Sequence, residues 1–319
     1  MTDSIVKPAH VHIDPLGGLA GDMFNAAMLD AWPALEDVAR EAIAACDLPA
    51  GWHVIHGRRL SASIDARSFD VHGPDDHVHA QDHGHGHGHG DQPGATHRHD
   101  SGRYAEIKAR ISDMRLSASA IANAQGIYAR LAECEAVVHG IAVEDVHFHE
   151  LADFDSVVDI VTAGALIAAV GSCSWSVSSV PLGNGTVRTA HGPLPVPAPA
   201  TSRLLRGFDV HDDGIGGERV TPTGAAILSW LFPDGSTTRS ESFPKGTLGE
   251  TGCGAGMRQL KGCANIVRVQ AYHSSGKTGG RDTVGQIEFD VDDQTPEELA
   301  ATLSALRADV GIIDVVVRQ

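Results

Sequence analysis

Apolar and polar residues alternate at the start of the chain in a way that predicts a strand followed by a helix. Val11 and Ile13 lie two residues apart within 10–14, which is the period of a strand. A Gly-rich turn follows at 15–21. The helix expected next is capped by Asp22 and keeps its apolar residues on one face, at Met23, Phe24, Ala27, Met28 and Ala31. A strand, a Gly-rich turn and a helix predict an α/β domain.

Periodic segments continue through most of the chain. Residues 52–71 predict one or two further strands, and 173–221 predict short strands and loops. Helical spacing recurs from Tyr104 to Met114. It recurs again in a helix that Ser117 caps and Gly140 closes. Two more helices are expected, at 157–170 and 225–231. Near the end, the pattern predicts a strand, a helix and a strand, at 286–291, 296–308 and 312–317.

One segment breaks this pattern. Residues 72–99 consist mainly of His, Gly and Asp, and they contain no apolar period. Such a composition cannot form a packed core, so we expect a disordered His-rich insertion at 73–102. The predicted architecture is therefore an α/β (α+β) domain over 1–272 that carries this insertion. A short strand-helix-strand piece at 283–319 looks like the truncated start of a C-terminal α+β domain.

The composition of the chain argues against some classes of binding partner. The chain has 24 basic and 41 acidic residues, for a formal charge of −17, which disfavours nucleic acid as a ligand. Five scattered cysteines without CxxC spacing indicate reduced thiols and a cytoplasmic protein. The most apolar stretch, 157–170, contains Asp159 and is shorter than a membrane span, so no membrane association is expected.

The His-rich segment offers the first candidate chemistry. Imidazole suits nickel, zinc and copper, and a flexible Gly chain can wrap its histidines around a cation. The predicted metal ligands are His83, His85, His87 and His89. The alternative is a tolerated low-complexity insertion without a physiological metal.

A second candidate lies at 146–150, before three aspartates. If this segment is extended, His147 and His149 project to the same side. Together with Glu150 and Asp155 they could bind a divalent cation or transfer protons. The alternative is a polar turn that Asp155 caps. A zinc-protease motif is excluded because Asp153 replaces the second His of HExxH.

Two further segments resemble anion-binding turns. In the turn 14–22, Gly18 and Gly21 could let backbone amides approach a phosphate, and Asp14 and Asp22 would favour one bridged by a metal. The turn lacks the GK[ST] ending of a P-loop. The second group comprises Thr221 and Thr223, before a helix, and His191 beside Gly192. Helix caps and ordinary loop architecture are the alternatives for this group.

These motifs, in this order, resemble the LarC family of nickel-insertion proteins. The matching segments are Gly21-Asp22-Met23-Phe24, Val138-His139-Gly140, 146–150, 155–161, Ala190-His191-Gly192, 195–201, 221–226, 254–256 and 265–269. A His-rich loop before the first long helix is also typical of that family. Two features differ. Pro15-Leu16-Gly17-Gly18 stands where the family often has Cys-Phe-Ser-Gly, and only the opening of the family's C-terminal domain is present.

The resemblance implies a lyase-type nickel insertase. It would place nickel into pyridinium bisthiocarboxylic acid mononucleotide and so form the nickel-pincer cofactor of lactate racemase, its expected recipient. CTP with Mg or Mn is implied as co-substrate, although the domain linked to CTP is represented here only by its beginning. A homo-oligomer is compatible with these expectations.

The residues can be assigned to roles within this reaction. The mononucleotide would bind near Asp14, Gly18, Gly21, Asp22, Thr221 and Thr223. Nickel would meet His147, His149 and Glu150, and protons would pass through His149, Asp155 and His191. Two other classes of function remain open at this point. One is a nickel store or chaperone without chemistry, and the other is a metal-dependent hydrolase of a small phosphorylated compound.

Overall fold

The computed structural model describes residues 5–74, 102–148, 153–233 and 246–274, and the single positions 295, 299, 302, 303 and 306. The chain divides into two compact units, Met1–Gly276 and Lys277–Gln319. In the second unit, the Leu299 N–H donates to the Thr295 carbonyl at 3.0 Å, which is the spacing of an α-helical turn. The strands expected at 286–291 and 312–317 lie outside the described residues, as does the insertion at 75–101.

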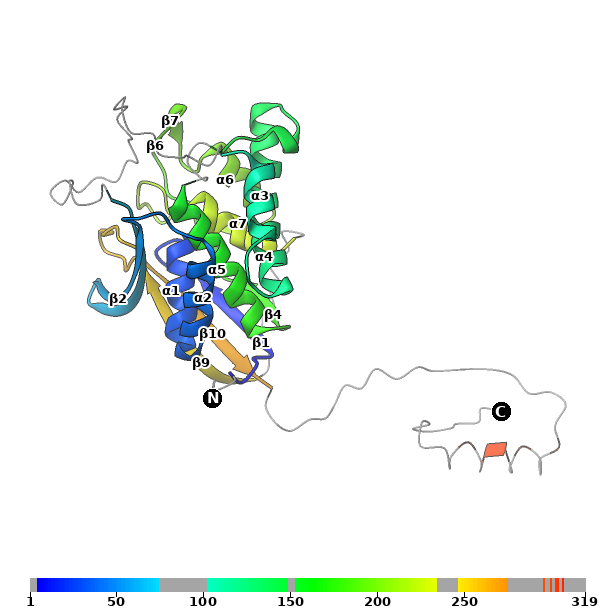
Figure 1. Cartoon of the computed structure of the whole chain (residues 1–319). Helices are drawn as coiled ribbons and strands as arrows, with labels where there is room; N and C mark the ends of the chain where they lie inside the picture. Colours follow the sequence, from blue (N-terminus) through cyan, green and yellow to red (C-terminus); the bar gives the residue numbers. More distant parts are fainter. Residues whose placement is uncertain are drawn as a thin grey trace. The chain divides into compact units, whose positions relative to one another are not determined.

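A mixed six-stranded sheet forms one side of the first unit (Figure 1). Its strands follow the order β2-β3-β9-β10-β1-β4, and they comprise β1 (His10–Asp14), β2 (His53–Ser61), β3 (Ile64–His72), β4 (Ser174–Val177), β9 (Thr247–Ala255) and β10 (Ile266–His273). The β1–β4 and β3–β9 pairs are parallel, and the other neighbours are antiparallel. Two small ribbons pair β5 (Val180–Pro181) with β8 (Val210–His211), and β6 (Thr186–Thr189) with β7 (Gly192–Pro195).

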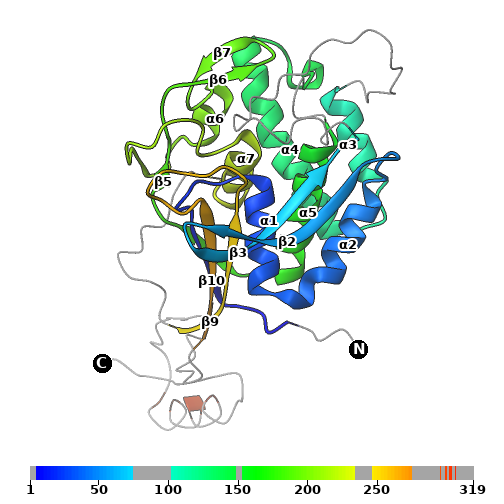
Figure 2. The same cartoon turned by 90° about the vertical axis from the view of Figure 1, so that its left-hand side faces the viewer.

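Helices cover one face of this sheet, as the two views in Figures 1 and 2 show. Helix α1 (Gly21–Ala31) lies against β9, close enough that a Cβ on Gly254 would meet the Met23 carbonyl at 2.0 Å. Helix α5 (Phe154–Val170) lies beside α1, and α2 (Glu36–Ala45) packs against α5. An outer group comprises α3 (Tyr104–Ser112), α4 (Ala118–His139), α6 (Pro199–Leu204) and α7 (Pro222–Leu231). The predicted α/β class is therefore confirmed.

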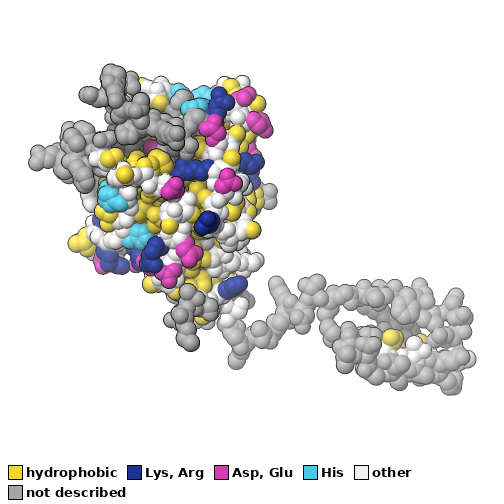
Figure 3. Space-filling view, in the orientation of Figure 1, with side chains coloured by type: hydrophobic (Ala, Val, Ile, Leu, Met, Phe, Trp, Pro, Cys, Tyr) yellow, Lys and Arg dark blue, Asp and Glu magenta, His cyan; other side chains and the backbone are white. Residues whose placement is uncertain are grey.

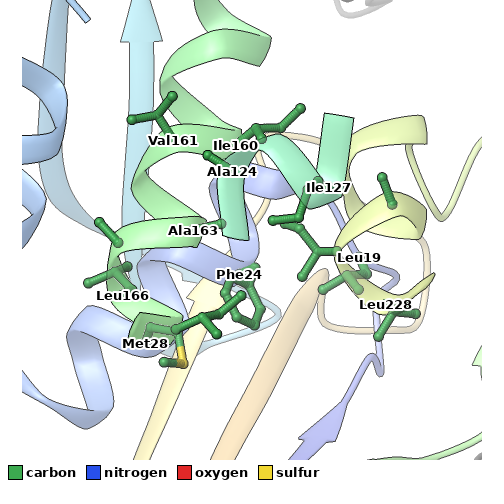
Figure 4. Packing of buried hydrophobic residues seen from close by; sticks show 14 of the residues in the cluster. Leu19, Phe24, Met28, Ala124, Ile127, Ile160, Val161, Ala163, Leu166 and Leu228 are labelled. Atoms are coloured by element: carbon green, nitrogen blue, oxygen red, sulfur yellow. The ribbon is translucent and has the colours of Figure 1, made fainter. Parts of the chain in front are cut away.

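The core forms where α1, α4, α5 and α7 meet (Figure 4). Phe24, Ile127, Ile160, Leu166 and Leu228 are fully buried there. Helix α5 is apolar on almost all sides because it lies between α1 and α4. Among the described residues, no helix is both long and apolar enough to cross a membrane.

The capping residues predicted from the sequence are correct for α4 and wrong for α1. Ser117 caps α4 by accepting the Ala120 N–H at 3.2 Å, and Gly140 ends this helix at a φ of +68°, as expected. Asp22 does not cap α1. The cap position is Ala20, and Asp22 lies inside the first turn, where it accepts the Met23 N–H. Tertiary partners satisfy the earlier donors instead, since the Gly21 N–H reaches the Thr223 hydroxyl at 3.3 Å.

Candidate functional site

Four aspartates converge where α1 and α5 begin and near the end of β3. We call Asp22, Asp70, Asp155 and Asp159 the carboxylate cluster. Asp159 is only 4% exposed, and its Oδ1 has no hydrogen-bond partner among the described residues. Asp159 lies so close to the start of α1 that position 21 must be glycine, because a Cβ there would lie 2.6 Å from Asp159 Oδ2.

Burial and mutual repulsion disfavour charge in this cluster. Burial, followed by the charge of Asp155, raises the pKa of Asp22 to about 7, against the opposing Met23 N–H and Arg59. Burial also raises the pKa of Asp159 well above its usual range, and the charges of Asp155 and Asp22 add to this. The carboxylate cluster can therefore hold a proton near neutral pH and release it when a cation arrives.

One arginine partly balances these charges. Arg59 of β2 donates to both carboxylate oxygens of Asp70, at 2.9 and 3.1 Å. Asn25, fully buried on α1, donates to the Asp159 backbone carbonyl at 3.0 Å. Arg59, Asp70 and Asn25 were not predicted as site residues. The Asp70 carboxylate on a predicted strand was an available signal, but nothing local linked it to α1.

The His-rich insertion leaves the described structure close to the start of α5. Gly73, just after β3, lies against Trp52, since a Cβ there would meet the indole ring at 3.2 Å. The Trp52 ring in turn packs on Phe154, the first residue of α5, with ring centroids 5.2 Å apart. Asp155 is the next residue, so the entry to the insertion is linked by contact to the carboxylate cluster.

The chain returns from the insertion beside the motif at 146–150. The Phe148 N–H donates to the Gly102 carbonyl at 2.8 Å, and Arg103 pairs with His147 in an antiparallel bridge. Tyr104 then starts α3, with its N–H bonded to the Val146 carbonyl at 3.0 Å. Both ends of the insertion therefore flank the segment that leads from His147 into α5.

The two predicted anion-binding turns pack against each other. Leu19 and Val220 form a parallel bridge, and the Gly18 Cα approaches so closely that a Cβ would lie 1.9 Å from the Arg219 carbonyl oxygen. The turn amides are already used, because the N–H groups of Gly17, Gly18, Leu19 and Gly21 all donate within the protein. A phosphate at this place would therefore need other donors than these amides.

Thr221 and Thr223 are the hydroxyl donors of this region. Their Oγ1 atoms lie 2.9 Å apart, and Thr221 caps α7 by accepting the Gly224 N–H at 3.3 Å. The buried Arg219 stabilises the first of the two turns. It donates to the carbonyl oxygens of Gly17 and Leu16 at 2.7 and 3.1 Å, and to Asp213 at 2.8 Å.

The remaining predicted residues are not brought into the carboxylate cluster. His191 lies near the end of α4, with its ring centroid 5.0 Å from that of His139, and histidine side chains gather at this end of the molecule in Figure 3. Asp14 is bound by Arg268 at the C-terminal end of β1, on the sheet face opposite α1. His149, Glu150, His83, His85, His87 and His89 lie outside the described residues. Within the described part of the chain, no group of three His, Cys, Asp or Glu side chains is arranged to hold a metal ion.

Comparison with known proteins gives a consistent result. A family model described as "Nickel insertion protein" matches residues 11–319. A relative in Geobacter metallireducens, named "Putative nickel insertion protein", is 39% identical over 95% of this chain and 70% of its own length. One of the same name in Pelobacter propionicus is 38% identical over 96% of this chain and 70% of its own length. A third, in Myxococcus xanthus, is 33% identical over 95% and 70%. No solved structure matches.

Proposed function

Because this chain belongs to the nickel insertion protein family, we propose that it inserts nickel into pyridinium bisthiocarboxylic acid mononucleotide. The product would be the nickel-pincer cofactor, and lactate racemase or a related enzyme would receive it. CTP with Mg or Mn would be the co-substrate. We place the reaction in the cytoplasm, where five unpaired cysteines would stay reduced.

One observation supports this proposal most strongly. The two ends of the His-rich insertion lie at the start of α5, through the Trp52–Phe154 contact and the Gly102–Phe148 hydrogen bond. Nickel captured by imidazoles of the insertion is therefore tethered next to the carboxylate cluster. Tethering raises the local concentration of the ion and makes its transfer intramolecular.

The carboxylate cluster supplies the base that insertion requires. Sulfur and carboxylate ligands bind nickel in their deprotonated form, so metal binding displaces protons. Asp22, whose pKa is raised to about 7 by burial and by Asp155, can exchange such protons near neutral pH, and burial likewise favours the protonated form of Asp159. In this proposal His147, His149 and Glu150 receive the ion from the insertion, and His191 assists proton transfer from the end of α4.

The mononucleotide would bind at the paired turns. Thr221 and Thr223 present hydroxyl groups at the N-terminus of α7, where the helix dipole favours a phosphate. Gly18 and Gly21 allow the backbone of the first turn to approach this point. Asp14 and Asp22 lie at the two ends of that turn and would favour a phosphate bridged by a divalent cation.

Reconstitution tests the proposal directly. Purified chain, nickel, CTP-Mg and the sulfur-bearing mononucleotide are mixed, and activation of apo lactate racemase is measured. A variant in which the eight histidines of 75–101 are replaced by Ser should activate slowly at low nickel and normally at high nickel. Asp155→Asn should activate about 10- to 100-fold more slowly at both concentrations, and Asp113→Asn, an exposed carboxylate at the end of α3, should behave as wild type.

The alternatives predict other outcomes. A nickel store would never activate apo racemase, and the His-to-Ser variant would lose its nickel binding. A hydrolase of a small phosphorylated compound would turn over without any nickel transfer. Activation by wild type that Asp155→Asn leaves unchanged would remove the carboxylate cluster from the proposal.

A further inference from the structure

Histidine and serine side chains alternate across β1 and β4 on the sheet face opposite α1. The strand period places Val11 and Ile13 toward the helices, where both are fully buried, and His10, His12 and Asp14 on the other face. The parallel register sets His10 opposite Ser174 and His12 opposite Ser176. The nickel-transfer proposal makes no use of these residues except Asp14.

These side chains form one continuous hydrogen-bonded chain. Ser174 Oγ lies 2.7 Å from His10 Nδ1, and His10 Nε2 lies 2.7 Å from Ser176 Oγ. Ser176 Oγ is also 2.7 Å from His12 Nδ1, and His12 Nε2 is 3.1 Å from Asp14 Oδ1. The three middle members are buried, at 7% exposure each, so water cannot easily replace these partners.

When both imidazoles are neutral, all hydrogen bonds of this series run in one direction. A neutral ring has one N–H and one bare nitrogen, and burial, followed by the charge of His12, lowers the pKa of His10. With Asp14 ionised, His12 Nε2–H donates to Asp14, and Ser176 donates to the bare His12 Nδ1. His10 Nε2–H then donates to Ser176, and Ser174 donates to His10 Nδ1. All donors point toward Asp14.

Both ends of this hydrogen-bonded series also allow its donors to point in the opposite direction, away from Asp14. Ser174 is exposed and has a second acceptor, the Ala9 carbonyl, at 3.2 Å. At the other end, Ser178 Oγ lies 3.0 Å from His12 Nε2 and also donates to Asp14, so its hydroxyl can serve either group. The chain therefore has partners for its end groups in both orientations.

A cavity lies at the Asp14 end. It has a volume of about 240 Å³ and is lined by Asp14, Leu16, Ile64, Cys253, Ile266 and Arg268. Arg268 donates to Asp14 Oδ2 at 3.0 Å. Burial alone would raise the pKa of Asp14, but hydrogen bonds from His12, Ser178 and Arg268 outweigh it and hold that pKa well below its usual range. The ionised carboxylate is therefore the resting form.

We propose that Ser174, His10, Ser176, His12 and Asp14 form a reversible proton relay between solvent and this cavity. In the inward direction, His12 Nε2–H passes its proton to Asp14, and Ser176 gives its proton to His12 Nδ1. His10 Nε2–H replaces the Ser176 proton, Ser174 gives its proton to His10 Nδ1, and a proton from the solvent restores the Ser174 hydroxyl. One proton has entered and one has reached Asp14, while both imidazoles have changed tautomer. The outward direction reverses each transfer.

The relay has a role in nickel insertion, and this part rests on the function proposed above. Nickel displaces protons from the acid groups of its ligand, and these protons must leave the site. An acid in the cavity would protonate Asp14, and the outward direction would carry that proton to solvent at Ser174. Among the residues that the structure describes, the charged and titratable groups facing the relay are Arg268 and Tyr272 of β10 and Cys253 of β9. Burial raises the pKa values of Tyr272 and Cys253, so neither exchanges protons near neutral pH.

The tautomers of His10 and His12 test the relay without any activity assay. Nitrogen-15 NMR of the full-length chain should show Nε2–H on both rings at neutral pH. In Asp14→Asn, Arg268 keeps the amide oxygen on its side, so the amide NH₂ faces His12 Nε2 and stands in for protonated Asp14. Both rings should then change to Nδ1–H. Adding Ser176→Ala to that variant should leave His12 at Nδ1–H and return His10 to its tautomer in Ser176→Ala alone.

Opposite tautomers on the two rings of wild type would overturn the relay, and this measurement needs no variant. The relay would also be overturned if His10 kept its wild-type tautomer in Asp14→Asn while the backbone amide spectrum of that variant was unchanged. The use of the relay is tested by single-turnover nickel insertion in H₂O and D₂O. Ser176→Ala should slow insertion about tenfold or more and abolish the solvent isotope effect. Wild-type kinetics in Ser176→Ala would show that insertion does not use the relay, whereas no insertion by wild type would contradict only the proposed function.

Discussion

The Gly102 carbonyl accepts the Phe148 N–H at 2.8 Å, and this bond joins the end of the His-rich insertion to the motif that precedes α5. A His-rich segment attached elsewhere on the surface could only collect metal. Here it returns beside His147, six residues before the N-cap of α5, Asp153. This connection gives the insertion a defined place to deliver an ion.

Trp52→Ala tests the other attachment of the insertion. Loss of the ring contact with Phe154 and of the packing on Gly73 should loosen the entry to the insertion without removing any imidazole. Nickel stoichiometry, measured by equilibrium dialysis, should stay the same, while insertion at low nickel should slow several-fold. Trp52→Phe keeps an aromatic ring and should retain most of the rate. Equal rates in all three proteins would show that this contact does not position the insertion.

Gly18→Ala should destabilise the fold strongly. Its φ of +128° disfavours any Cβ, and the Arg219 carbonyl oxygen would lie 1.9 Å away, so the two turns must separate. We expect a loss of at least about 3 kcal/mol in the free energy of unfolding, measured in urea. Gly185→Ala is the matched control, since Gly185 has a φ of +93° and open space around it. It should cost about 1 kcal/mol, and equal losses at both positions would contradict the close packing of the turns.

Arg219→Met should be much more costly than Arg258→Met. Arg219 is buried, and its loss leaves the Leu16 and Gly17 carbonyls and Asp213 without their donor. The expected loss is about 3–5 kcal/mol. Arg258 is exposed and also donates to two carbonyl oxygens, so its replacement should cost less than about 1 kcal/mol. Urea unfolding of the two variants gives the comparison, and a similar loss in both would contradict the bracing role of Arg219.

Asp22→Asn should change the pH dependence of stability. The pKa of Asp22 is raised on folding, so the folded state binds more protons than the unfolded state between about pH 4 and 7. Its ionisation therefore lowers stability as the pH rises through 7. The amide avoids this cost, and the variant should be about 1–3 kcal/mol more stable than wild type at pH 8, with a smaller difference at pH 5.

Urea unfolding at both pH values makes this comparison, and Asp113→Asn, at an exposed position, should show no such trend. A variant of Asp22 whose difference from wild type is the same at pH 5 and pH 8 would contradict the shifted pKa.

The sequence predicted the end of a helix correctly where a single capping residue determines it. Ser117 and Gly140 fixed the ends of α4 because capping depends on neighbouring atoms only. Strand β9 was missed, since its sequence Gly252-Cys253-Gly254 contains small residues that look like a loop. The reason for these glycines is the close approach of α1, which the sequence does not display.

The site was predictable only in part. Asp22, Asp155 and Asp159 were visible as carboxylates near helix starts, and the motif order indicated the family. That Asp159 faces Gly21, and that Arg59 and Asp70 complete the carboxylate cluster, depends on the packing of α5 on α1. Asp22 looked like a cap because its true environment comes from residues far along the chain.

The central claim is that nickel held by the insertion reaches the acceptor beside the carboxylate cluster, which takes up the protons that the metal displaces. The most direct measurement loads the chain with nickel, removes the excess and follows single-turnover transfer to the mononucleotide. We predict that Asp155→Asn binds as much nickel as wild type and transfers it about 10- to 100-fold more slowly, while Asp113→Asn is unaffected. Transfer by Asp155→Asn at the wild-type rate would contradict the claim.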